Sequence, residues 1–253
     1  MSPPMAVRRL KGKSTTDMTT SAAAIRQELR KLGHATIAEH SQRFFKTGKG
    51  EYGAGDKFLG VRVPVIRKHV RKHREAPLRT VVVLLKSPWH EERLFAVLSL
   101  ADRFKRGDEE VRRAVFDTYI EHRKYVNNWD LVDSSAHIVV GGWLESRSRK
   151  MLYRYARSTD LWERRIAIIS TYHFIRLRDF YDTVAIAEIL LDDEEDLIHK
   201  ASGWMLREVG NRHFATEDKF LKKHYKLMPR TMLRYAIEKF PEKKRQAYLK
   251  GKV

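Results

Sequence analysis

Apolar residues recur along this sequence at the three- and four-residue spacing of an α-helix, as in Leu94, Val97 and Leu98. Alternating patterns typical of strands are scarce, and Gly and Pro lie mostly between the apolar stretches. Two segments match each other at an offset of 71 residues, KSPWHEERLFAVL (86–98) and RSTDLWERRIAII (157–169). Half of this offset is about the length of one helical hairpin. The sequence therefore predicts an all-α fold, a solenoid of stacked HEAT-like helical hairpin repeats.

The phase of the repeat continues through five positions with separations of 36, 35, 35 and 34 residues: Leu94, Asp130, Arg165, Lys200 and Arg234. We expect each in the second helix of its hairpin, where corresponding positions of successive repeats line a concave surface. Four of the five are charged and three are basic, which suggests a charged ladder along that surface. A solvated helix face would also be charged, so the ladder alone assigns no function.

The chain carries a large excess of positive charge. Lys and Arg total 51 against 32 Asp and Glu, a formal net charge of +19. Such an excess is typical of proteins that bind a polyanion, and nucleic acid is the leading partner. An anionic membrane surface would also attract the chain, and some proteins are simply cationic. A basic concave surface can follow a phosphate backbone, which favours nucleic acid.

The composition also limits the chemistry and the domain organisation. The chain has no cysteine, which excludes disulfides, thiolate zinc sites and a cysteine nucleophile, and which is compatible with a reducing cytoplasm. No segment approaches the roughly 20 apolar residues that span a bilayer, so we expect no membrane partner. Residues 1–20 mix proline, basic and hydroxyl residues, a composition that does not favour packing. We expect a disordered basic tail at 1–20 and a single HEAT-like repeat domain at 21–253.

One short motif combines an aromatic residue with a carboxylate. Asn127 and Asn128 form a plausible helix cap, and Asp130 suits the first helical turn. Trp129 and Asp133 are then four residues apart and share one helix face. A core tryptophan beside a surface aspartate would give the same spacing, so the spacing leaves both interpretations open.

Other chemistries have weaker signals. His69 and His73 have the spacing of helical metal ligands, but they lie in the basic run RKHVRKHR without a nearby carboxylate, which favours a solvated basic face over zinc. The lone GxG at 53–55 has no flanking strand, and no GxSxG or HExxH motif occurs. We therefore predict no metal and no cofactor.

Four stretches together resemble the AlkD-like DNA alkylation repair family. The family's WD-x-VD-S motif is similar to NNWDLVDS (127–134), and its N-terminal signature to FLGVRVPVIRK (58–68). Two further family motifs resemble LWERRIAII (161–169) and IHKASGWMLREVG (198–210). The stretches follow one another on the repeat phase, and the likeness covers roughly residues 21 to 240.

The resemblance implies a right-handed superhelical α-solenoid and a bacterial, monofunctional DNA glycosylase that removes cationic N3- or N7-alkylated purines from duplex DNA. It places the family's catalytic carboxylate on Asp133, its paired tryptophans on Trp129 and Trp204, and its active-site arginine on Arg165. The family's N-terminal aromatic positions have no clear match, so Phe44, Phe45 and Tyr52 stay outside the predicted site. The residues expected to bind DNA are Arg164, Arg165, Lys200 and Arg234.

These residue types suit the reaction. An alkylated purine is already cationic and leaves readily, so the enzyme must mainly stabilise the positive charge that develops on the deoxyribose, and a fixed carboxylate does so. An indole face attracts a cationic base. Arg165 would fix a phosphate beside the lesion, and as a groove-facing side chain it would contribute little to the core. We expect a monomer in the cytoplasm, associated with the nucleoid.

Three other functions compete with this one. A non-catalytic module of the same fold would bind damaged or branched DNA without cutting a bond. A protein-interaction solenoid would have a more apolar concave face. RNA binding is compatible with the charge, although the sequence has no stacking motif of an RNA-binding module.

Overall fold

The computed structural model describes residues 21–253, and the predicted tail at 1–20 lies outside them. Within the described residues the regular elements are all helical, and the one β-bridge joins single residues, Lys57 and Trp89. The first half contains α2 (Ala22–Lys31), α3 (Ala35–Phe44), α4 (Val63–Lys72), α5 (Leu78–Leu85), α6 (His90–Arg106), α7 (Glu109–Glu121), η1 (Arg123–Tyr125), α8 (Trp129–Asp133) and η2 (His137–Gly141). The second half contains α9 (Lys150–Tyr155), α10 (Leu161–Ser170), α11 (Tyr172–Arg176), α12 (Tyr181–Ile189), α13 (Asp196–Gly210), α14 (Phe214–His224), α15 (Arg230–Ala236), η3 (Ile237–Lys239) and α16 (Glu242–Leu249).

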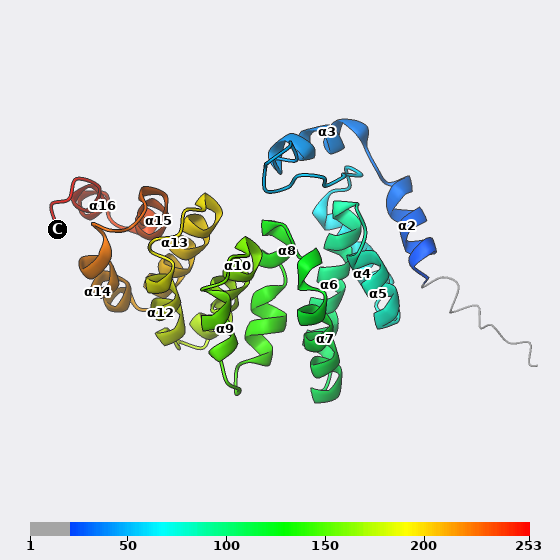
Figure 1. Cartoon of the computed structure of the whole chain (residues 1–253). Helices are drawn as coiled ribbons and strands as arrows, with labels where there is room; N and C mark the ends of the chain where they lie inside the picture. Colours follow the sequence, from blue (N-terminus) through cyan, green and yellow to red (C-terminus); the bar gives the residue numbers. More distant parts are fainter. Residues whose placement is uncertain (1–20) are drawn as a thin grey trace, which may run out of the picture.

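The helices stack side by side into an arc, with α2 and α16 at opposite ends (Figure 1). Successive second helices pack on one another, α6 on α8, α8 on α10, α10 on α13 and α13 on α15. The helices α7, α9 and α12 lie along the other side of the stack. One continuous hydrophobic core runs from Ile25 to Tyr248. The expected all-α solenoid of helical hairpins is confirmed.

Local sequence signals set several helix starts. The side chain of Asn128 accepts a hydrogen bond from the Trp129 amide, so the predicted cap at the start of α8 is present. Asp108 caps α7, and Asp160 caps α10. Beyond α8 the helix widens into the π-helical turn η2, an irregularity that is common near functional sites.

The repeat phase holds in the structure with one shift of register. Leu94, Arg165, Lys200 and Arg234 are each the fifth residue of their helices, α6, α10, α13 and α15. In α8 the fifth residue is Asp133, whereas the predicted ladder position, Asp130, is the second. Asp130 also lies in a second helix as predicted, but Asp133 is the residue that corresponds to the other four.

A buried glutamate attaches residues 59–61, in the segment after α3, to the stack. The Glu91 carboxylate, at the start of α6, accepts hydrogen bonds from the amides of Leu59, Gly60 and Val61 at 2.8, 2.7 and 3.2 Å. Gly60 has a φ of +81°, and a Cβ there would lie 2.1 Å from the His34 carbonyl oxygen, so the position requires glycine. In the structure α3 arches away from the stack, and the following loop reaches toward α8 (Figure 1).

The expectation of a solvated face at His69 and His73 is wrong. His73 is buried, and its Nε2 lies 2.9 Å from the Glu28 carboxylate of α2, a carboxylate distant in sequence. His69 Nε2 lies 3.8 Å from the same group, and Lys72 also binds it. In the described part of the chain, no cluster of three or more acidic or histidine side chains has the arrangement of a metal site.

Candidate active site

A pocket of about 570 Å³ opens where α8, α10, α13 and α15 face the loop after α3. All four side chains that the sequence predicted to carry the chemistry lie in its wall. They are Trp129 and Asp133 of α8, Arg165 of α10 and Trp204 of α13. The pocket is lined by Phe44, Lys46, Tyr52, Trp129, Asp133, Arg165, Glu195, Asp196, Leu197, Lys200, Trp204, Arg207 and Tyr235.

Asp133 and Arg165 form a two-point ion pair in the wall of the pocket. Arg165 Nε donates to Asp133 Oδ1 at 2.9 Å, and Arg165 Nη2 donates to Oδ2 at 2.8 Å. The remaining guanidinium nitrogen, Nη1, donates to the Leu197 carbonyl oxygen. A bidentate pair of this kind fixes both the position and the rotation of the carboxylate. The Asp133 side chain keeps 18% of its surface exposed, so it faces the pocket while its orientation is fixed from behind.

Burial raises the pKa of Asp133 above its ordinary value, and the charge of Arg165 acts in the opposite direction. Arg165 itself is only 4% exposed. The expectation that it contributes little to the core is therefore wrong, because its charge is enclosed between α8 and α13 and is balanced there by Asp133. Breaking such a pair leaves a buried charge without a partner.

Trp129 forms one side of the pocket and is supported by aromatic residues that the sequence did not place in the site. Phe45 stacks on Trp129 with ring centroids 5.2 Å apart and an interplanar angle of 18°. Phe44 meets it edge-on at 5.9 Å. We call residues 44–57 the roof, because Phe44, Lys46 and Tyr52 of this segment line the pocket together with Asp133 and Arg165. In the sequence, the adjacent Phe44 and Phe45 before a glycine-rich loop were the signal that could have predicted an aromatic contribution to the site.

The far side of the pocket consists of α13 and α15. Trp204 donates a hydrogen bond to Glu208, and its ring lies 6.1 Å from that of Tyr172. Lys200 lies one turn earlier and pairs with Asp196 at 2.7 Å, with 40% of its side chain exposed. Asp133, Trp129, Trp204 and Arg165 thus surround one hollow, so the interpretation of Trp129 and Asp133 as a core tryptophan with an unrelated surface aspartate fails.

Two of the residues expected to bind DNA lie outside the pocket. Arg164 Nε binds the Asp193 carboxylate at 2.6 Å, and its Nη1 donates to two backbone carbonyl oxygens. Arg234 is exposed on α15 and is not among the lining residues, whereas its neighbour Tyr235 is. Arg165 and Lys200 are in the wall.

His137, one turn after Asp133, is a histidine close to the site. Burial lowers its pKa to about 4, and its Nδ1 lies 3.1 Å from the Asp133 carbonyl oxygen. A neutral ring hydrogen-bonded to the backbone is poorly suited to protonating a leaving group near neutral pH. The pocket also offers a fixed carboxylate bordered by two indole rings, an arrangement that can stabilise positive charge.

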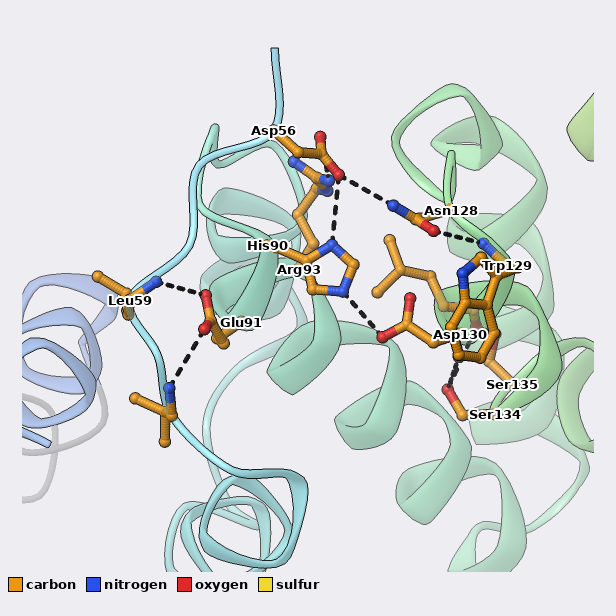
Figure 2. Close-up of polar contacts among 12 residues, drawn as sticks. Asp56, Leu59, His90, Glu91, Arg93, Asn128, Trp129, Asp130, Ser134 and Ser135 are labelled. Atoms are coloured by element: carbon orange, nitrogen blue, oxygen red, sulfur yellow. Dashed lines mark hydrogen bonds and ion pairs between the residues drawn. The ribbon is translucent and has the colours of Figure 1, made fainter. Parts of the chain in front are cut away.

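Behind Trp129 lies a buried polar network (Figure 2). His90 on α6 stands between two carboxylates, Asp56 of the roof at 3.3 Å from Nδ1 and Asp130 of α8 at 2.8 Å from Nε2. Arg93 binds the other Asp56 oxygen at 2.7 Å. Asn128 donates to Asp56 at 3.2 Å while it caps α8. The network therefore connects the roof with the helix that carries Trp129 and Asp133.

The family model and the solved structure that match this chain both carry the description of a DNA alkylation repair enzyme. A family model described as DNA alkylation repair enzyme matches residues 25–240. Among curated proteins, no sequence matches the chain. A solved structure from Enterococcus faecalis, described as a predicted DNA alkylation repair enzyme, is 15% identical, with a TM-score of 0.66 over 83% of this chain and 97% of that one. At this identity the structural likeness establishes the fold alone.

None of the described helices combines the length and apolar character needed to cross a membrane.

Proposed function

The chain belongs to the DNA alkylation repair enzyme family, and on that premise we propose that it is a monofunctional DNA glycosylase. It hydrolyses the N-glycosidic bond of cationic N3- or N7-alkylated purines in duplex DNA. The observation that carries this proposal is the Asp133 carboxylate, fixed by two hydrogen bonds from Arg165 and bordered by Trp129 and Trp204. It acts as a monomer on DNA in the bacterial cytoplasm.

Asp133 stabilises the cationic sugar of the transition state. As the glycosidic bond lengthens, positive charge develops on the deoxyribose, and a carboxylate held in place offers a negative charge without reorganisation. Arg165 keeps that carboxylate in one rotamer, although part of the charge of Asp133 is thereby neutralised. The same carboxylate orients the water that attacks the sugar.

The two indoles attract the cationic base through their negative ring faces. Phe45 stacks on the far side of Trp129 and holds its ring in place. Lys200 of α13 and Lys46 of the roof, which both line the pocket, bind the phosphates that flank the lesion as point charges. Arg165 has two donors engaged by Asp133 and one by a carbonyl oxygen, so its main contribution is to position the carboxylate.

The test is release of 7-methylguanine from methylated duplex DNA by the purified protein, with Asp133→Asn as the comparison. The asparagine keeps the size of the side chain and removes its charge. We expect single-turnover release to fall on the order of 100-fold or more, since electrostatic stabilisation is the main effect of the carboxylate. Duplex binding should change little under conditions where the variant, in which the buried Arg165 lacks its anion, is folded. Full release by Asp133→Asn would contradict the mechanism, and no release by the unmodified chain would indicate a binding module.

A further inference from the structure

The network behind Trp129 is a buried polar cluster that the proposed chemistry does not use. His90, Asp56 and Arg93 are each 9% exposed or less. None of these three residues, and neither Asn128 nor Asp130, is among the residues that line the pocket. Its members come from three places in the chain, the roof, α6 and α8 (Figure 2). A buried charged cluster costs free energy to assemble unless its charges are matched, so its composition needs an explanation.

The geometry favours a doubly protonated His90. Both ring nitrogens face carboxylate oxygens, Asp56 on one side and Asp130 on the other, and a carboxylate only accepts hydrogen bonds. Only the imidazolium donates on both sides. With Arg93 as the second cation, the charges of the cluster then balance, His90 and Arg93 against Asp56 and Asp130. In accordance with this, burial alone would lower the pKa of His90, but Asp130 and Asp56 raise it to about 9.

The His90 ring also lies in an aromatic stack that ends at the pocket. Phe58 stacks on His90 at 4.6 Å, and Phe45 lies 4.9 Å from the same ring. Phe45 in turn stacks on Trp129. His90 therefore helps to fix the position of Trp129 through two sets of contacts. One runs through the Phe45 ring, and the other through Asp130, the residue next to Trp129 in α8.

We propose that His90 is a positioning residue that holds the roof closed against α8 and thereby sets the distance between the roof side chains, Trp129 and Asp133. The proposal rests on the proposed function for its effect on excision, but its effect on the roof is independent of that function. When His90 loses its charge, one of its two carboxylates loses a donor, and the closed roof is left with an excess of buried negative charge. The roof then opens more often, and the lesion is held less accurately.

The pH dependence follows from the sign of the shift. The pKa of His90 is raised from 6.5 to about 9 in the closed state. Its contribution to closure is therefore complete below about 6.5 and is lost as the pH rises through about 9. Segments that other contacts hold in place should not loosen as the pH rises through this range. Residues 59–61 are one such segment, because Glu91 holds them by backbone hydrogen bonds.

The experiment compares amide hydrogen exchange and single-turnover release of 7-methylguanine in four proteins: the unmodified chain, His90→Gln, His90→Gln/Asp130→Asn and His73→Gln. The double variant removes one positive and one negative charge and so restores the balance of the cluster. His73→Gln is the matched control, because His73 is also a buried histidine paired with a carboxylate, Glu28, but has no contact with the roof.

For His90→Gln we expect faster exchange in overlapping peptides that cover residues 45–56, unchanged exchange at 59–61, and release slower on the order of 10- to 100-fold. The double variant should recover much of the protection. Release by the unmodified chain and by His73→Gln should fall as the pH rises through about 9, whereas both His90 variants should lack this fall.

Unchanged exchange of the roof in His90→Gln would overturn the proposal, as would equal loosening of the roof in His73→Gln. A double variant less protected than the single one would disprove the role of charge balance. If the unmodified chain releases no base, the proposed function fails, and the exchange comparison still decides whether His90 holds the roof.

Discussion

At the scale of single residues, the Asp133–Arg165 pair has two effects that oppose each other. A guanidinium 2.8–2.9 Å from both carboxylate oxygens weakens the negative charge that the pocket presents. The same guanidinium keeps a largely buried carboxylate ionised and prevents it from rotating. Because burial raises the pKa of Asp133, an aspartate without this partner would be protonated more readily and would lose its electrostatic effect. The pair therefore fixes the position of the Asp133 carboxylate but weakens the negative charge that this carboxylate presents to the pocket.

Arg165→Ala should therefore affect both stability and release. It leaves Asp133 buried without its cation, which costs about 3–5 kcal/mol for such pairs. The free energy of unfolding from urea denaturation measures this cost. The double variant Asp133→Asn/Arg165→Ala removes the unpaired charge and should be more stable than Arg165→Ala alone. If Arg165→Ala unfolds at the same urea concentration as the unmodified chain, the pair does not hold α8 and α10 together.

At the scale of helices, α13 and α14 enclose a second titratable group, which does not line the pocket. Glu217 on α14 is 2% exposed, and burial together with the nearby Asp218 raises its pKa from 4.5 to about 8. Gly210 at the end of α13 makes room for its carboxyl group, since a Cβ there would overlap Glu217 Oε2. The folded chain therefore favours the protonated form of Glu217.

This shift predicts how stability responds to pH. Between pH 4.5 and about 8 the folded state binds a proton that the unfolded state has released. The free energy of unfolding should fall across this range by up to about 1.4 kcal/mol for each pH unit and then level off. Glu217→Gln should lack this contribution and become the more stable protein above neutral pH. Urea midpoints across the range, with the exposed Glu121→Gln as control, measure it, and parallel curves for both variants would contradict the assignment.

The sequence predicts the parts of the site that are local in the chain. Trp129 and Asp133 share a helix face because they are four residues apart, and the Asn128 cap follows from residue type alone. Sequence similarity added Trp204 and Arg165. The roof was not predictable in this way, since its position depends on contacts across 30 to 40 residues, from Glu91 to residues 59–61 and from His90 to Asp56. No periodic pattern records such contacts.

At the scale of the whole molecule, the positive charge is distributed along the stack as well as in the pocket. Arg67 and Arg71 of α4 line a second hollow of about 230 Å³ together with Arg74, just after that helix, Lys105 of α6 and Ser134, the residue after Asp133. The two hollows therefore come close together at the end of α8, where Asp133 lines the first and Ser134 the second. A duplex seated over Asp133 would bring phosphates near the arginines of α4, so α4 should add affinity without reading sequence.

Salt dependence tests this arrangement, because each phosphate neutralised by a cation adds about 0.9 to the slope of log affinity against log salt on duplex DNA. We expect the unmodified chain to bind undamaged duplexes of different sequence equally well, with an affinity that falls steeply as salt rises. Arg67→Ala/Arg71→Ala should lower that slope by roughly 1–2 and weaken binding to all duplexes alike. Lys150→Ala/Lys219→Ala removes the same charge from exposed positions on α9 and α14, so a change in net charge alone would affect both double variants equally. Fluorescence anisotropy titrations at several salt concentrations distinguish the two cases. A reduced slope in the α4 variant only would place α4 on the DNA path, whereas equal slopes in all three proteins would mean that the duplex leaves the pocket in another direction.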